Sequence, residues 1–207
     1  MGQIIFLRHG QAKNNVDKIL AGRTEGVPLT ETGISQAQHA AELLTHMKIG
    51  AIYSSPIQRA KHTAEIVGEK NSIDVTIDDR LIELDMGKFT GKSYSEIISE
   101  RGNVFEKFYN GDLEIAHNGV ETFDQVKKRV KSIVDHVIEK HEDQNVVLVT
   151  HMDPIKAMIS TVVDLSPPNL FSLIIANASL NLFRESNKTF SLSAINLMHP
   201  SRFDQNY

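Results

Sequence analysis

Short apolar segments alternate along the chain with longer segments of helical periodicity, and this alternation limits the possible folds most strongly. The apolar runs cover residues 4–7, 51–53 and 146–149. Runs of this length, separated by helices, are typical of strands buried within a parallel sheet. The pattern predicts an α/β three-layer sandwich: a mostly parallel mixed sheet with helices on both faces.

Four segments between or after these runs are predicted to be helical. Apolar residues at three- and four-residue spacing predict a helix over 31–47 and another after Thr122, where Gln125 completes a capping box. The other two are expected to begin at Ser55 and at Asp153, because each is followed by a proline suited to the first helical position.

The remaining segments suggest how the domain is completed. Residues 180–183 and 190–195 flank the turn-like sequence ESNK and predict a closing hairpin. Residues 1–207 are expected to form one domain, in which the irregular segment 87–119 is a cap or lid. Its aromatic residues are interpreted as packing residues rather than as a pocket wall; they are Tyr94, Phe105, Phe108 and Tyr109.

Composition and charge narrow the possible partners. The net charge of −4, from 22 basic and 26 acidic residues, provides no basic field for a nucleic acid. The chain has no cysteine, which excludes thiol nucleophiles and zinc–thiolate sites and fits a reducing cytoplasm. The first apolar run ends at Arg8, too early for a signal peptide or a membrane span. We therefore expect a soluble cytoplasmic protein with no membrane partner.

Polar residues follow each of the three predicted strands. Arg8 and His9 follow the first, Arg59 lies a few residues after the second, and His151 follows the third. Taken alone, each of these residues is more often an exposed or hydrogen-bonded core residue than part of a functional site. However, the carboxyl ends of parallel strands meet at one edge of the sheet, where helix N-termini favour anions. We therefore expect the four side chains to converge on one anion, with Gly10 letting the backbone turn closely around it.

Two arginines and two histidines around an anion are suited to phosphoryl transfer. A neutral imidazole can attack phosphorus while guanidinium groups bind the non-bridging oxygens. Nearby cations should also lower the pKa of the attacking histidine and keep its lone pair available. A leaving alkoxide needs a proton, and a carboxylic acid kept protonated by its surroundings could supply it. No metal-binding pattern is apparent.

Six segments resemble the histidine phosphatase superfamily, also called the phosphoglycerate mutase-like family. In chain order they are FLRHGQAKNN, GVPLTETGISQAQHAAELL, IYSSPIQRAKHTAEI, LIELDMGKFTGKS, NGVETFDQVKKRV and VVLVTHMDPIKAMI. The resemblance implies a metal-independent enzyme that forms a phosphohistidine intermediate. His9 would be the nucleophile and Glu83 the proton donor, with Asp85 as the nearest rival for that role. The implied phosphate and substrate contacts come from Arg8, Asn15, Gly22, Arg59 and His151.

Three residues depart from the family pattern. Ala12 stands where a serine or threonine hydroxyl is usual, and Met152 replaces a common glycine after the second histidine. Asp153 stands where the mutases have asparagine. Because a carboxylate near a phosphate would be repelled, we interpret Asp153 as the cap of its helix.

The same pocket could serve a phosphatase or a mutase. The segment between Glu83 and His151 is short and lacks adjacent arginines, which favours a phosphatase acting on small phosphomonoesters. The alternative is a phosphoglycerate mutase that uses 2,3-bisphosphoglycerate as its primer; otherwise we expect no cofactor. Substitute carboxylate contacts for a mutase could come from Lys13, Arg23, Lys88, Lys92 and Arg101. The expected partner is a small phosphorylated metabolite, and a homodimer is possible.

Two further readings belong to other classes of protein. A non-catalytic sensor of a phosphorylated ligand would not need the acid Glu83. A metal-dependent hydrolase is disfavoured because His136 and His141, five residues apart, do not share a helix face. The other histidines show no ligand spacing and are interpreted as surface or packing residues; they are His39, His46, His62, His117 and His199.

Overall fold

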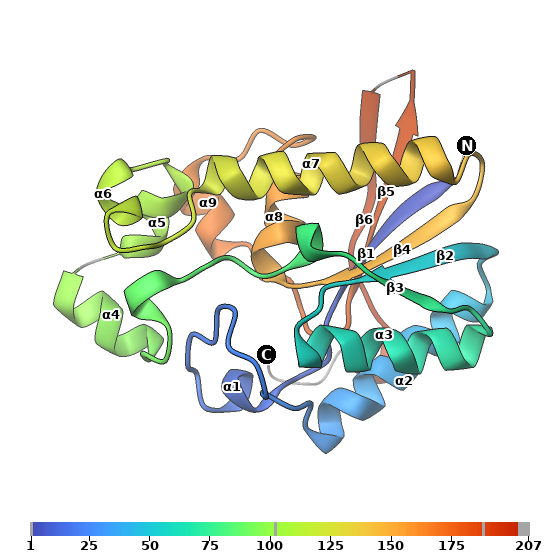
Figure 1. Cartoon of the computed structure of the whole chain (residues 1–207), viewed down its shortest axis with the longest axis horizontal. Coiled ribbons are helices and arrows are strands. Elements are labelled where there is room, and N and C mark those ends of the chain that lie inside the picture. The colour runs from blue at the N-terminus through green and yellow to red at the C-terminus, as the bar shows by residue number, and fades with distance from the viewer. Residues whose placement is uncertain (1, 102, 188, 203–207) are drawn as a thin grey trace.

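The computed structural model describes residues 2–101, 103–187 and 189–202, and the chain folds around a six-stranded sheet (Figure 1). The strand order is β3-β2-β4-β1-β5-β6. Strands β3, β2, β4 and β1 run parallel, whereas β5 is antiparallel to both β1 and β6. The bounds are β1 Gln3–Arg8, β2 Ile49–Ser54, β3 Val75–Ile77, β4 Asn145–Thr150, β5 Leu180–Ser186 and β6 Thr189–Leu197. The predicted mixed sheet and closing hairpin are confirmed.

Helices cover both faces of the sheet. Helices α2 and α3 lie on one face and α7 and α8 on the other, which gives the predicted three layers (Figure 1). The bounds are α1 Lys13–Val16, α2 Glu31–Thr45, α3 Gln58–Asn71, α4 Tyr94–Arg101, α5 Val104–Tyr109, α6 Leu113–Ala116, α7 Phe123–Lys140, α8 Met152–Ile159 and α9 Pro167–Ser172. Short 3-10 turns cover η1 Asp79–Leu81, η2 Gly87–Phe89 and η3 Pro200–Arg202.

The alternation of side chains along β1 explains why its apolar run is continuous. Ile5 and Leu7 belong to the core beneath α2 and α3, whereas Ile4 and Phe6 belong to the core beneath α7 and α8. Successive strand residues point to opposite faces, so a strand covered on both sides must be apolar throughout. Burying each such side chain stabilises the fold by about 1.5–3 kcal/mol. The sheet therefore holds the residues that follow β1 and β4 rigidly.

Two predicted helix starts are wrong. Helix α3 begins at Gln58, with Ile57 before it, and the hydroxyl of Ser55 instead accepts from the Ile57 N–H at 3.3 Å. Helix α8 begins at Met152, so Asp153 is its second residue and its side chain does not cap it. Pro154 is the third residue of α8, where a proline is tolerated because the N–H groups of the first turn have no partner within the helix. Pro56 lies outside α3, before Ile57. The capping box at Thr122 and Gln125 is confirmed.

Segment 87–119 forms η2, α4, α5 and α6, and these helices gather at one end of the molecule (Figure 1). Phe108 and Tyr109 are buried and their rings pack against Phe123, 5.4 and 5.1 Å between ring centres. Phe105 stacks on Phe171 of α9. These three aromatics are packing residues as predicted. Tyr94 packs against Phe105 but also lines the two pockets of the candidate site, so the prediction that it forms no pocket wall is wrong. A lid function of the segment stays a prediction.

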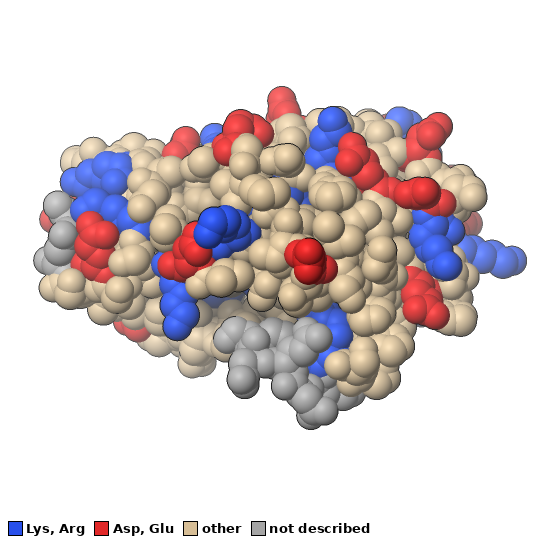
Figure 2. Space-filling view, turned by 90° about the horizontal axis from the view of Figure 1, so that it is seen from below, with Lys and Arg blue, Asp and Glu red and all other residues tan. Residues whose placement is uncertain are grey.

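The outer surface is mixed in charge on the face that Figure 2 shows, where lysines and arginines are interspersed with acidic residues. Within the described residues, no helix has the length and apolar character needed to cross a bilayer.

Candidate active site

The pairing of β1 with β4 brings the two predicted site histidines together. Arg8 is opposite Thr150 in this parallel pair, so His9 and His151 leave the sheet at the same level. The backbone N–H of His9 still donates to the carbonyl of Thr150 at 3.0 Å. The two imidazole rings lie 5.1 Å apart, centre to centre, and both are buried.

His9 is arranged as a nucleophile. Its Nδ1 lies 2.7 Å from the carbonyl oxygen of Gly10, which can only accept, so we assign the proton to Nδ1. The lone pair of Nε2 then accepts from Nε of Arg59, 3.3 Å away. Burial, followed by the charges of Arg59 and Arg8, holds the pKa of His9 well below its usual value. The imidazole is therefore neutral at neutral pH.

Two arginines flank His9 from different elements. Arg59, in the first turn of α3, is only 2% exposed and donates from Nη2 to the carbonyl of Gly22 at 2.7 Å. Arg8, at the end of β1, donates from Nη1 to the carbonyl of Ile175. Burial lowers the pKa of both guanidinium groups, but arginine remains charged in proteins. Each is held by backbone carbonyls rather than by a carboxylate, which leaves its charge available to an anion.

His151 is fully buried, and its Nε2 lies 2.9 Å from the hydroxyl of Ser55. Its Nδ1, like Nε of Arg8, is buried without a hydrogen-bond partner in the described part of the chain. Buried polar nitrogens are costly when unpaired, so both atoms fit a site that receives an oxygen-rich ligand. Burial and the nearby arginines hold the pKa of His151 well below its usual value.

Glu83 follows η1 and is buried beside this cluster, with Oε1 accepting from the Leu84 N–H at 2.8 Å. Burial, followed by the charge of Asp153, raises the pKa of Glu83 to about 7. Asp85 differs: its side chain is 44% exposed, accepts from the Gly87 N–H at 2.9 Å and lies 3.6 Å from Arg23. The geometry favours Glu83 over Asp85 as the acid.

Asn15 and Gly22 also lie in the pocket wall, with structural contacts of their own. Asn15 Oδ1 accepts from the Ala12 N–H at 2.9 Å and from the Asn177 amide at 3.3 Å. Gly22 has a φ of +49°, which favours glycine, and a Cβ there would meet the side chain of Met86 at 3.1 Å. Both residues shape the loop whose carbonyl holds Arg59.

The contacts of Gly10 show a packing reason for glycine, and its predicted place beside an anion stays a prediction. A Cβ on Gly10 would lie 2.3 Å from the backbone oxygen of Gly33 in α2. Its N–H donates to the hydroxyl of Thr63 at 3.0 Å. The close approach of α2 therefore requires glycine here.

Most of these residues line a pocket of about 370 Å³ that adjoins a more open pocket of about 790 Å³, whereas His151 and Gly10 lie outside both linings. The inner pocket is lined by Arg8, His9, Asn14, Asn15, Ile19, Leu20, Ala21, Gly22, Arg59, Glu83, Met86, Tyr94, Met152 and Asp153. The outer pocket shares six of these and adds Lys18, Ile174, Ala176 and Asn177. Sequence reasoning missed Lys18 and Asn177, because loop residues carry no periodic signal. Ala12 lies outside both linings, whereas Met152 lines both.

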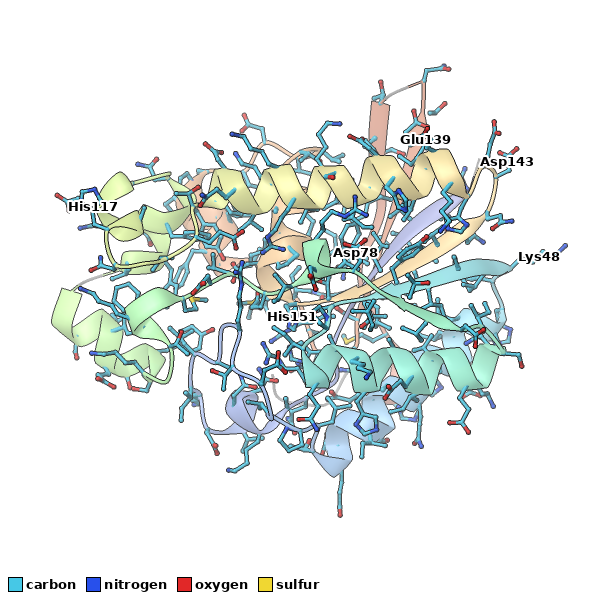
Figure 3. The ribbon with its side chains drawn as sticks, viewed as in Figure 1. Lys48, Asp78, His117, Glu139, Asp143 and His151 are labelled. Carbon is cyan, nitrogen blue, oxygen red and sulfur yellow. The ribbon has the colours of Figure 1, made fainter. Side chains whose placement is uncertain are left out.

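The other histidines lie elsewhere. His39 stacks on His199 at 4.8 Å, and His141 Nε2 lies 2.9 Å from the hydroxyl of Tyr53. Figure 3 shows His151 near the centre of the molecule and His117 at the distant end beside α6. Among the residues that the structure describes, no three histidine, aspartate or glutamate side chains are grouped as metal ligands.

Comparison with known proteins assigns this site to a family. The model of the histidine phosphatase superfamily, branch 1, matches residues 4–198. The chain belongs to this superfamily. The six resembling segments and the expected α/β fold are thereby confirmed, and the protein is an enzyme of the phosphatase and mutase type.

Relatives within the histidine phosphatase superfamily include both activities. A 2,3-bisphosphoglycerate-dependent phosphoglycerate mutase of Thermoplasma acidophilum is 37% identical over 196 residues, covering 93% of this chain and 92% of that protein. Phosphoserine phosphatase 1 of Hydrogenobacter thermophilus is 28% identical over 200 residues, covering 95% and 93%. The structure of a mycobacterial glucosyl-3-phosphoglycerate phosphatase in complex with VO3 has a TM-score of 0.85 at 26% identity, covering 95% and 100%.

Proposed function

We propose that the protein is a phosphatase of small phosphomonoesters that acts through a phosphohistidine. In the first step Nε2 of His9 attacks phosphorus, so a P–N bond forms as the bond to the leaving oxygen breaks. Glu83 gives its proton to that oxygen, which leaves as an alcohol. Arg8, Arg59 and His151 bind the non-bridging oxygens and stabilise their charge in the transition state.

The second step returns the enzyme to its starting state. A water molecule enters through the outer pocket and gives a proton to the Glu83 carboxylate while its oxygen attacks phosphorus. The P–N bond breaks, inorganic phosphate leaves, and His9 and Glu83 regain their starting protonation. A buried acid with a pKa of about 7 is suited to both directions of this proton transfer.

The choice of a phosphatase over a mutase rests on the scarcity of lysine and arginine around the outer pocket. Among the described residues that line the two pockets, Lys18 is the one lysine or arginine in addition to Arg8 and Arg59. A bisphosphorylated primer places a second dianionic group beyond the first, and one exposed lysine would stabilise it weakly. A monoester with a neutral or singly anionic leaving group fits this charge distribution better.

The cations that could have substituted in a mutase are held by other groups, and Arg23, which donates to the Glu83 carbonyl at 3.0 Å, is the one that reaches the edge of the site among those described. Arg23 pairs with Glu121 at 3.0 Å, Lys13 with Asp17 at 2.9 Å and Lys92 with Glu96 at 3.3 Å. Lys88 is exposed, with its ammonium 6.0 Å from the Phe89 ring centre. None of these four lines either pocket. The side chain of Arg101 lies outside the described part of the structure.

A mutase remains the second candidate, because the Thermoplasma mutase is 37% identical to this chain. The test is a panel of phosphomonoesters that includes 3-phosphoglycerate with and without 2,3-bisphosphoglycerate. Release of inorganic phosphate faster than isomerisation supports the phosphatase. Isomerisation well above phosphate release, dependent on the bisphosphate, overturns it.

A sensor without turnover is the alternative from another class. It would not need Glu83 buried beside the anion pocket, where an unpaired carboxylate is unfavourable. Rapid quenching should trap an acid-labile phosphoprotein in the native enzyme and none in His9→Ala. Turnover that persists in excess chelator would agree with a metal-independent mechanism.

The proposal also includes the cofactor, the partner and the location of the enzyme. We propose that phosphatase turnover uses no cofactor and that the partner is a small phosphorylated metabolite rather than nucleic acid or a membrane. The absence of cysteine supports a cytoplasmic location. Sedimentation would show whether the chain forms a homodimer.

A further inference from the structure

A second buried carboxyl, Asp153, lies in the wall of the inner pocket, and the steps above give it no role. It is the second residue of α8 and is 2% exposed. Glu83, at 8% exposure, lines the same pocket. Two carboxyl groups thus share one enclosed space with the anion site.

Asp153 is held by groups that favour its ionised form. The Tyr109 hydroxyl donates to Oδ1 of Asp153 at 2.6 Å, and Tyr109 is fixed by its ring packing. Lys156, one turn later on α8, donates to the carbonyl of Phe171 at 3.2 Å, with its ammonium 5.0 Å from the Tyr109 ring centre. Burial lowers the pKa of Lys156 to about 8, so it remains mostly protonated at neutral pH.

Glu83 has less support for a negative charge. Within the described part of the chain, its carboxyl accepts from the N–H of Leu84 alone. Burial raises the pKa of both carboxyls, but Lys156 and the Tyr109 hydroxyl oppose this at Asp153. Two carboxyls in one enclosed site do not readily ionise together, and the one with better donors ionises first.

The other charged or titratable groups around the pair come from several elements. Around Glu83 these are Arg59 of α3, Arg129 of α7, Arg8 of β1, Tyr94 of α4, Tyr109 of α5 and Lys156 of α8; around Asp153 they are Tyr109, Lys156, Arg8, Arg129 and Tyr94. Arg8 and Arg129 attract both carboxylates and Arg59 attracts Glu83, whereas Tyr109 donates a hydrogen bond to Asp153 and the charge of Lys156 is the largest that lowers the pKa of Asp153. The support that Asp153 has beyond the shared arginines therefore comes from α5 and α8.

We propose that Asp153, kept ionised by Tyr109 and Lys156, is a positioning residue that holds one proton on Glu83 at neutral pH. This inference rests on the proposed role of Glu83 as the acid. Asp153 acts through Glu83 and has no part in bond making or breaking. The pair carries a single proton, and the surroundings of Asp153 assign that proton to Glu83.

The test measures the protonation of Glu83 directly, without substrate. Carboxyl carbons of glutamate are labelled with 13C and titrated by NMR, and the Glu83 signal is assigned by its absence in Glu83→Gln. The variant Asp153→Asn keeps an acceptor for Tyr109 but loses the negative charge. In this variant the pH at the midpoint of the Glu83 titration should fall by roughly one unit. An unchanged midpoint overturns the proposal.

Asp85→Asn is the matched control, because it removes a carboxylate two residues from Glu83 that lies outside the pocket lining. Its Glu83 midpoint should stay at the native value. A shift equal to that of Asp153→Asn would mean that general charge, rather than the Asp153 contact, sets the midpoint, and would overturn the proposal.

Tyr109→Phe decides the question if Asp153→Asn does not fold. Without the hydroxyl, Asp153 competes better for the shared proton, so the Glu83 midpoint should move in the same direction by a smaller amount. A folded Tyr109→Phe protein with the native midpoint would contradict the proposal. The backbone amide NMR spectrum reports folding for each variant.

Activity provides a second readout that separates this inference from the proposed function. With an alkyl phosphate, the loss of kcat at high pH should begin at lower pH in Asp153→Asn than in the native enzyme. If the NMR midpoint of Glu83 moves but the profile of kcat against pH does not, the role of Asp153 in turnover is contradicted. If the native protein hydrolyses no phosphomonoester, the proposed function fails, whereas the NMR titration still decides whether Asp153 holds the Glu83 proton.

Discussion

The guanidinium of Arg59 donates from Nε to Nε2 of His9 across 3.3 Å, so the positive charge proposed to bind phosphate lies against the proposed nucleophile. The same side chain is fixed by the Gly22 carbonyl through Nη2. Because the carbonyl and the imidazole are both neutral acceptors, the charge of Arg59 is oriented without being neutralised. In the proposed mechanism, this one group aligns the nucleophile with the phosphate.

Arg59→Lys should therefore lower kcat/KM with p-nitrophenyl phosphate by about 10²–10³-fold, because an ammonium cannot keep this forked geometry. Steady-state kinetics measures the change. Lys61→Arg, two residues along α3 at an exposed site, should retain native kinetics. A native-like Arg59→Lys enzyme would show that orientation by the guanidinium is unnecessary.

Glu83→Gln should slow hydrolysis of alkyl phosphates by about 10²–10⁴-fold, because glutamine cannot protonate the leaving alkoxide. Hydrolysis of p-nitrophenyl phosphate should fall far less, since its leaving group is stable as an anion. The ratio of kcat values for the two substrates measures the effect. Equal losses with both substrates would remove Glu83 from the role of acid.

The activity should decline as the pH rises through about 7, where Glu83 loses its proton. His9 has a pKa well below its usual value, so it stays neutral and active on the acidic side of this range. A pH profile of kcat/KM with an alkyl phosphate should show one descending limb near neutrality. A profile that rises through this range would contradict the assigned protonation states.

The burial of Glu83 should reduce stability at neutral and alkaline pH. Burial raises the pKa of its carboxyl from an ordinary value of 4.5 to about 7 in the folded protein, so the unfolded chain loses its proton first as the pH rises. Stability from this group is complete below about pH 4.5 and is lost by about pH 7, up to about 3 kcal/mol. Glu83→Gln should raise the free energy of unfolding at pH 8 but not at pH 4. Equal effects of the substitution at both values would contradict this linkage.

The parts of the site that follow strands were predictable from the sequence. Arg8, His9 and His151 directly end apolar runs, and parallel pairing places strand ends together whatever the loops do. Arg59 was predictable from its place after β2, even though α3 starts later than expected. Short-range patterns are sufficient here because the backbone of the sheet sets the geometry.

The surroundings of Asp153 were not predictable in this way. Its partner Tyr109 is 44 residues away in sequence, and the hydrogen bond between them depends on how α5 packs beside α8. A local rule assigned Asp153 to a helix cap, because an aspartate before a proline is common there. Tertiary burial overrode that rule. Lys18 and Asn177 likewise reach the outer pocket from loops whose course no periodicity encodes.

The register that pairs Arg8 with Thr150 has a consequence for how such enzymes diversify. His9 and His151 follow the buried strands β1 and β4, where a slip of one residue would turn every core side chain to the wrong face. Glu83 and Asp153, the proposed acid and its partner, instead depend on a connecting segment and on Tyr109 of α5. Substitutions in these outer segments should therefore change the pH at which the proposed enzyme works, while the sheet keeps His9 and His151 in place.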